Sequence, residues 1–150
     1  MGRRLDLLTG KWIEDKPKKK APEAAVGRAV DSYLRALGAY MRQINSGGTM
    51  RNGRWTTSGQ GAGISDRIGV LPGGRMICVE LKAPGKKRTI TEAQYLFLAN
   101  VIKRGGCGVV ADCVEDVATA LNHTQEDLLR ELNQNGRFSS LADTLDAGKK

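Results

Sequence analysis

The spacing of apolar side chains along this chain predicts an alternation of helices and strands. Between residues 22 and 37, apolar side chains recur every three or four positions, as on the buried face of an amphipathic helix, and Gly38 is a natural end for it. A second helix is expected at residues 91–104, because Thr91 and Gln94 form the sequence pattern of a capping box. Four shorter runs have the length and apolar content of strands: residues 39–45, 66–71, 76–82 and 107–113.

The order of these elements indicates an α/β fold. The segment Pro-Gly-Gly-Arg at residues 72–75 separates two of the strands and is typical of a hairpin turn. Two further helices are predicted at residues 114–122 and 124–134. We therefore expect a mixed β-sheet flanked by helices. Three parts are predicted along the chain: a flexible basic arm (residues 1–21), a main domain (22–120) and a C-terminal helical extension (121–150).

Residues 46–63 are predicted to form a long polar loop rich in glycine. Loops of this length in compact domains are usually either functional or disordered. The glycines match neither a P-loop nor a dinucleotide-binding fingerprint, because the residues and spacings that complete those motifs are missing. The loop carries Arg51, Arg54 and Trp55, and Trp55 would either stack on a nucleic-acid base or pack over the core.

The charge of the chain says more about its possible partners than the length of the chain does. One domain is the default for 150 residues, and the net charge is +8. Residues 23–114 carry 13 basic and only 6 acidic side chains, whereas residues 115–150 are acidic on balance. A basic body attracts polyanions, of which nucleic acid is the commonest. The basic segment at residues 16–20 would be either a solubilising tail or an arm that contacts phosphates.

Several protein classes are excluded by the same sequence. No apolar run approaches the roughly 18 residues of a membrane-spanning helix, so we do not expect a membrane protein. No apolar segment follows Arg3 and Arg4, which argues against secretion. The three cysteines match no metal-binding spacing and are expected to be reduced thiols. A cytoplasmic protein is the expectation that follows.

Candidate chemistry is concentrated at the end of the strand predicted at residues 76–82. Side chains alternate along a strand, so Glu80 and Lys82 share one face, and charged groups on an otherwise apolar strand need partners or water. In a hairpin turned at residues 72–75, residue i faces roughly residue 147 − i, which puts Asp66 within one position of Glu80. A one-residue bulge would place both carboxylates on one face. Two neighbouring carboxylates are stabilised by a shared cation, and Mg²⁺ prefers oxygen ligands.

These residues resemble a known family. The segment Gly-Ile-Ser-Asp at residues 63–66, followed by Val-Glu-Leu-Lys at residues 79–82 and by Gln94 in the next helix, is similar to the PD-(D/E)XK nuclease pattern. More closely, it resembles the VRR-Nuc (virus-type replication-repair nuclease) family, whose first helix has a leading acid that Glu23 matches. The similarity spans residues 22–120 and implies a restriction-endonuclease-like core with a mixed sheet flanked by helices, to which extra C-terminal helices are added.

The resemblance implies a role for each matching residue of the strand region. Asp66 and Glu80 would bind Mg²⁺ or Mn²⁺, with the backbone carbonyl of Leu81 as a further ligand. Lys82 would position or activate the attacking water.

Two matching residues lie on helices, and each also has a purely structural explanation. Glu23 would hold a water on the metal or a second metal, although an acid at this position also stabilises the helix dipole. Gln94 would orient Lys82 or the scissile phosphate, although it is also the capping-box partner of Thr91.

The activity that the resemblance implies is metal-dependent hydrolysis of phosphodiester bonds by a DNA endonuclease. Branched or flapped DNA would be the substrate, as for a Holliday-junction resolvase, and the protein would be a homodimer in the cytoplasm of a bacterium, encoded by the bacterium or by a phage. Two alternatives stay open: a non-catalytic DNA-binding module, and a nuclease subunit of a replication or repair complex that is gated by a partner. Seven residues are expected to contact DNA: Arg51, Arg54, Trp55, Arg67, Lys86, Lys87 and Arg88.

Overall fold

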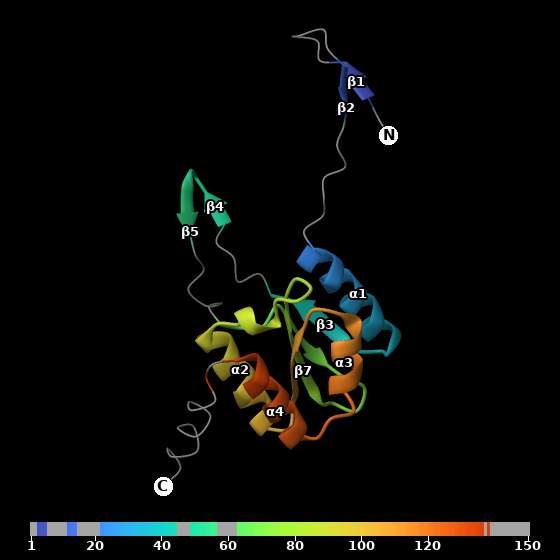
Figure 1. Cartoon of the computed structure of the whole chain (residues 1–150), viewed down its shortest axis with the longest axis vertical. Helices are drawn as coiled ribbons and strands as arrows, with labels where there is room; N and C mark the ends of the chain where they lie inside the picture. The colour runs from blue at the N-terminus through green and yellow to red at the C-terminus, as the bar shows by residue number, and fades with distance from the viewer. Residues whose placement is uncertain are drawn as a thin grey trace.

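The computed structural model of the chain contains a four-stranded sheet between two layers of helices (Figure 1). It describes residues 3–5, 12–14, 22–44, 49–56, 63–136 and 138. The elements of the main body are α1 (Pro22–Ala36), β3 (Tyr40–Gln43), β6 (Arg67–Val70), β7 (Met76–Leu81), η1 (Lys87–Thr89), α2 (Glu92–Lys103), β8 (Cys107–Ala111), α3 (Val114–Ala120) and α4 (Gln125–Asn135).

The sheet is mixed, as the sequence predicts. Its strand order is β3-β6-β7-β8, with antiparallel pairing between the first three strands and parallel pairing between β7 and β8. Figure 1 shows α1 and α3 on one side of the sheet and α2 and α4 on the other. The α/β fold class and the flanking helices are therefore confirmed.

The central strand β7 is buried because helices cover both of its faces. Residues Ile77 to Leu81 are all buried, and β8 is buried along its whole length. From one side α1 contributes Val26, Val30 and Leu34, which are spaced four residues apart and so lie on one face of the helix. Burying this apolar surface is the main driving force for the layered arrangement.

The pairing of β6 with β7 differs by one residue from the sequence expectation. Arg67 faces Val79 and Ile68 faces Cys78, so the numbers of facing residues add up to 146 rather than 147. Continued by one residue, this register places Asp66 opposite Glu80, with no bulge between Arg67 and Val70. The expected bulge is therefore wrong, and regular pairing alone brings the two acids to the same level of the sheet.

Two predicted irregular regions contain short strands. Within residues 46–63, β4 (Thr49–Arg51) pairs with β5 (Arg54–Thr56). They are joined by Asn52 and Gly53, whose φ angles of 52° and 72° suit a two-residue hairpin turn. In the predicted arm, β1 (Arg3–Leu5) pairs with β2 (Trp12–Glu14).

The rest of the predicted arm, residues 45–48 and 57–62 in and beside the predicted loop, and residues 137 and 139–150 lie outside the described residues. Among the residues that are described, no helix has the length and hydropathy needed to cross a membrane.

The C-terminal helix α4 packs onto the core. Leu128 and Leu132 are 2% and 3% exposed and belong to the same hydrophobic cluster as the sheet. The capping box of Thr124 and Asp127 fixes the start of this helix, which packs against α2 and β8.

Truncation of Leu132 to alanine is expected to lower the free energy of unfolding by roughly 2–5 kcal/mol, because it leaves a cavity between α4 and the sheet. Chemical denaturation measures this loss. The exposed Gln134 on the same helix is the control, and Gln134→Ala should change the free energy of unfolding by less than about 0.5 kcal/mol. Equal effects of the two variants would show that α4 is not packed as described.

Candidate functional site

The candidate site lies where β7 ends between α1 and α2. Glu80 is the penultimate residue of β7 and is 1% exposed. Its Oε1 accepts hydrogen bonds from Lys82 Nζ at 2.9 Å and from Gln94 Nε2 at 2.5 Å. The same Gln94 accepts from the backbone N–H of Thr91 at 2.9 Å, so the capping box that starts α2 also fixes the amide that holds Glu80. The predicted capping box is thereby confirmed.

The second oxygen of Glu80 is the exceptional atom of the site. Glu80 Oε2 is buried and has no hydrogen-bond partner among the described residues. Burial raises the pKa of the Glu80 carboxyl from 4.5 to about 7, and the negative charge of Asp66 acts in the same direction. The hydrogen bond from Lys82 and its positive charge oppose this shift. An unsatisfied buried carboxylate oxygen is costly unless a proton or a cation meets it.

Asp66 lies just before β6, at the level of Glu80 in the adjoining strand. Its Oδ2 accepts a hydrogen bond from the backbone N–H of Leu81 at 2.9 Å. This bond extends the β6–β7 pairing past the last regular pair and orients the Asp66 carboxylate. The Asp66 carboxylate is therefore fixed against the backbone of Leu81 at the end of the sheet.

A cleft of about 430 Å³ opens between α1 and this end of the sheet. Glu23 and Arg28 of α1 line it on one side, and Asp66 and Leu81 line it on the other. Glu23 is exposed and Asp66 is half-buried. The structure thus brings Asp66, Glu80, Lys82 and Gln94 to one sheet end, and it places Glu23 on the wall of the adjoining cleft.

The donor set suits a hard divalent cation. The possible ligands at this end of the sheet are all oxygen atoms: the carboxylates of Asp66 and Glu80 and the backbone carbonyl of Leu81, with the Glu23 carboxylate on the wall of the adjoining cleft. Mg²⁺ and Mn²⁺ favour such ligands. These four residues could therefore hold the cation that the sequence predicts.

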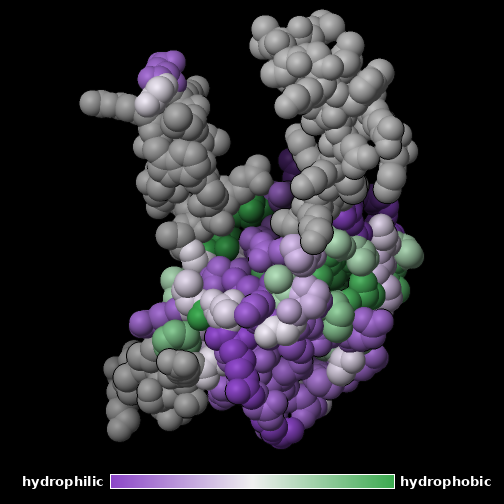
Figure 2. All heavy atoms as spheres, turned by 45° about the horizontal axis from the view of Figure 1, so that its top comes forward, coloured by the Kyte–Doolittle hydropathy of each residue, from purple (hydrophilic) through white to green (hydrophobic). Residues whose placement is uncertain are grey.

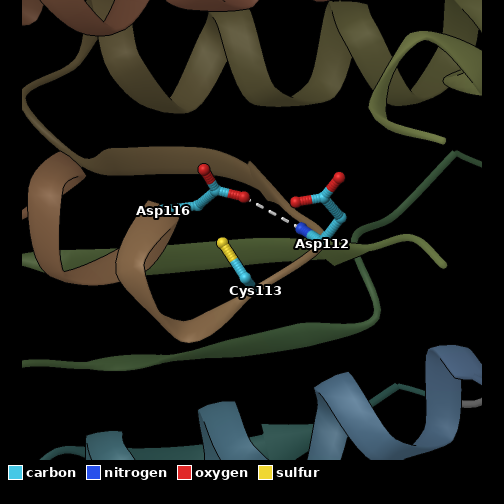
Figure 3. Close-up of side chains that lie close together, drawn as sticks. All are labelled: Asp112, Cys113 and Asp116. Carbon is cyan, nitrogen blue, oxygen red and sulfur yellow. Dashed lines mark hydrogen bonds between the residues drawn. The ribbon is translucent and has the colours of Figure 1, made fainter. Parts of the chain in front are cut away.

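A second acidic cluster, Asp112, Cys113 and Asp116, has ligand atoms within 4.8 Å of one another, but both of its carboxylates already accept hydrogen bonds (Figure 3). Asp116 Oδ1 accepts from Lys87 Nζ at 2.7 Å, and its Oδ2 accepts from the backbone N–H of Asp112 at 3.0 Å. The Asp112 carboxylate accepts from the backbone N–H of Gly85 at 2.8 Å. Through these hydrogen bonds, Asp112 and Asp116 connect the loop after β7 to the start of α3.

Two residues expected to contact DNA are engaged inside the protein. Lys87 donates to Asp116, as described above. Arg67 is 9% exposed, and its Nε and Nη2 donate to the two carboxylate oxygens of Asp31 at 2.7 and 3.0 Å. This geometry does not fit the expectation that Arg67 contacts phosphate, because the guanidinium points into α1 rather than to solvent.

The remaining DNA-contact candidates divide into two groups. Lys86 and Arg88 flank the start of η1, are exposed, and follow directly after the candidate site. The side chains of Arg51, Arg54 and Trp55 lie outside the described residues. The face seen in Figure 2 is mainly hydrophilic, with smaller hydrophobic areas between the polar side chains.

Sequence reasoning missed Arg28 and Asp31. Both line the cleft from α1, and Arg28 is exposed. The helical spacing from Glu23 could have located Asp31, since residues four and eight positions further on lie on the same face of a helix. Its pairing with Arg67, 36 positions away, carries no local sequence signal.

Comparison with solved structures shows what the fold is similar to. A structure described as a VRR_NUC domain matches with a TM-score of 0.50 and 22% sequence identity, over 69% of this chain and 98% of that chain. No protein-family model and no curated protein sequence matches the chain. At this identity the similarity concerns the fold alone, and it confirms the VRR-Nuc-like α/β core that the sequence predicts.

The raised pKa of Glu80 predicts an unusual pH dependence of stability in the absence of divalent cations. The folded carboxyl holds its proton up to about pH 7, whereas an unfolded one releases it near pH 4.5, so stability falls as the pH rises between these values. The expected loss is on the order of a few kcal/mol, since one pKa unit corresponds to about 1.4 kcal/mol. Urea unfolding at pH 5 and pH 8 in EDTA measures it.

The variant Glu80→Gln removes the titrating group and should flatten this dependence. The exposed Glu92 provides the control, and Glu92→Gln should keep the dependence of the parent. Parallel loss of stability in the parent and in Glu80→Gln would contradict the burial of an ionisable Glu80.

Proposed function

We propose that the protein is a metal-dependent endonuclease that hydrolyses phosphodiester bonds in DNA. The observation that carries the proposal is the buried carboxylate of Glu80, which has one unpartnered oxygen and lies beside Asp66, Lys82 and Gln94. The VRR_NUC structural neighbour and the net charge of +8 support it. If Glu80 and Lys82 formed only a structural ion pair at the surface, the second oxygen of Glu80 would not be expected to be buried without a partner.

Asp66 and Glu80 would bind Mg²⁺ or Mn²⁺ with the backbone carbonyl of Leu81, and Glu23 would complete the site from α1. When bound, the cation neutralises charge on the phosphate and favours a hydroxide-like nucleophile. The negative charge of the site falls on binding, which removes the penalty for ionising Glu80.

Lys82 would position the attacking water and stabilise the negative charge that develops on the phosphate. Its Nζ lies 2.9 Å from Glu80 Oε1 and 3.5 Å from Gln94 Oε1, so two acceptors fix its position. Gln94 would keep Lys82 in place through this contact while its amide N–H₂ donates to Glu80. A preorganised ammonium stabilises charge without reorganisation during the reaction.

The DNA backbone would be bound by basic residues at the edge of the cleft. Arg28 lines the cleft itself, and Lys86 and Arg88 follow the strand that carries Glu80 and Lys82. Arg51, Arg54 and Trp55 stay candidates for the same surface. These cations offset the repulsion between the acidic site and the phosphates.

The preferred substrate would be branched or flapped DNA, cut by a homodimer in the cytoplasm of a bacterium or of a phage-infected cell. The resemblance of residues 22–120 to VRR-Nuc nucleases supports this part of the proposal.

Removal of Lys82 or of the Asp66 carboxylate should abolish cleavage. In Lys82→Ala and Asp66→Asn, the rate of cutting labelled four-way junctions, flaps and single strands with Mg²⁺ or Mn²⁺ is expected to fall by at least about a thousandfold, as each 1.36 kcal/mol of lost stabilisation is tenfold. Arg130 on the exposed side of α4 is the control, and Arg130→Ala should cut as the parent does.

Equal rates in Lys82→Ala and the parent would refute the role of Lys82. A parent that binds every DNA with the same affinity in Mg²⁺ and EDTA and cuts none would instead be a DNA-binding module. Cutting that requires another protein would identify a partner-gated subunit.

Loss of Lys86 and Arg88 should weaken DNA binding without changing its sequence preference. The double variant Lys86→Ala/Arg88→Ala is expected to lower the dependence of log K on log [salt] by about 2, since each phosphate contact contributes about 1. Fluorescence anisotropy in EDTA at several salt concentrations measures this slope. Arg104→Ala/Arg130→Ala removes the same charge from exposed positions just after α2 and on α4 and should retain the parent slope.

A further inference from the structure

We propose that Asp31 and Arg67 are positioning residues of the candidate metal site: their ion pair fixes α1, and with it Glu23, against the strand end that carries Asp66. This inference rests on the proposed function. It assigns Arg67 a role different from the DNA contact that the sequence suggests, and it gives Asp31 a role where the sequence suggests none.

The pair has the geometry of a strong, directional contact. Two parallel hydrogen bonds of 2.7 and 3.0 Å join the Arg67 guanidinium to the Asp31 carboxylate, and the side chains are 11% and 33% exposed. Such bidentate pairs fix the orientation of both partners as well as their distance. The pair therefore sets both the position and the rotation of α1 relative to β6.

The same guanidinium also contacts the backbone of the candidate metal ligand. Arg67 Nη1 donates to the carbonyl oxygen of Asp66 at 3.3 Å. One planar group thus joins three features: the Asp31 carboxylate on α1, the first position of β6, and the peptide that carries the Asp66 side chain. A shift of α1 would be transmitted directly to Asp66.

The face of α1 that meets Arg67 also carries Glu23. Glu23, Gly27 and Asp31 are spaced four residues apart and lie on one face of the helix. A Cβ added at Gly27 would lie 3.0 Å from Leu81 Cδ1 and 3.2 Å from Arg67 Nη2, so the helix backbone rests directly on these two residues. Glu23, one turn earlier, consequently reaches the wall of the cleft that Asp66 and Leu81 also line.

Stability alone does not account for this pair. Helix α1 is already anchored by Val26, Val30 and Leu34, which are buried in the core. Even a fully buried ion pair is often no more stabilising than apolar residues of similar volume, and this pair is only partly buried, whereas a bidentate pair is directional. The orientation of α1 that the pair fixes is the one in which Glu23 and Asp66 line opposite sides of one cleft.

The test measures Mn²⁺ affinity by calorimetry, without DNA, at a temperature at which every variant is folded. Arg67→Lys and Asp31→Asn are expected to bind Mn²⁺ 10–100-fold more weakly than the parent, as is typical when a group supporting a metal ligand is lost. The double variant Asp31→Asn/Arg67→Lys should bind no more weakly than the weaker single variant, since the two residues act as one unit.

Val30→Ala is the matched control. It loosens the packing of the same helix without touching the pair, so it should lower the melting temperature and leave Mn²⁺ affinity within about twofold of the parent. A purely structural role for the pair would move the melting temperature alone.

The failure of this inference is distinct from the failure of the proposed function. Parent-like Mn²⁺ affinity in Arg67→Lys and Asp31→Asn, with a parent that binds Mn²⁺ and cuts DNA, would overturn the positioning role only. A parent that binds no Mn²⁺ and cuts no DNA would overturn both. A parent that binds Mn²⁺ without cutting, together with weakened variants, would support the positioning role and refute the nuclease.

Discussion

The structure depends on how it accommodates one carboxylate, that of Glu80, at the buried end of its central strand. Ionising this group away from water costs several kcal/mol unless partners compensate. Lys82 and Gln94 meet one of its oxygens, and nothing among the described residues meets the other. Burial accordingly raises the pKa of Glu80 to about 7. Such a carboxylate is suited to meet a cation, because a cation would satisfy the unpartnered oxygen and favour the ionised form.

The surrounding elements are arranged so that each fixes one part of this site. The capping box begins α2 at the point where Gln94 can reach Glu80, so helix initiation and site geometry share one set of hydrogen bonds. The regular β6–β7 register brings Asp66 to the level of Glu80, and the Leu81 N–H holds it there. On the other side, Gly27 lets α1 approach closely enough for Asp31 to pair with Arg67. Three local features of the sequence thus converge on one end of the sheet.

The sequence predicts contacts between residues that are close along the chain better than contacts between residues that are far apart. The four strands of the main sheet and the capping box of Thr91 and Gln94 are set by residues within a few positions of each other, and the sequence predicts them correctly. The sequence also places Glu80 and Lys82 on one face of their strand, and the two side chains are in contact. The exact register could not be fixed, since a one-position change in the hairpin moves Asp66 relative to Glu80. The β4–β5 hairpin was missed although Asn52-Gly53 is a strong turn signal, because the glycines around it suggest a loop. The pairs Asp31–Arg67 and Lys87–Asp116 span 36 and 29 positions and leave no local trace, so their basic members were assigned to DNA.

Whether Asp66 and Glu80 form a divalent-cation site is tested most directly by locating Mn²⁺ in crystals through its anomalous scattering. We expect an ion within coordination distance of an Asp66 carboxylate oxygen and of Glu80 Oε2, at roughly 2.0–2.3 Å. Mn²⁺ bound only at Asp112 and Asp116, or no ion at any concentration that leaves the protein folded, would contradict it.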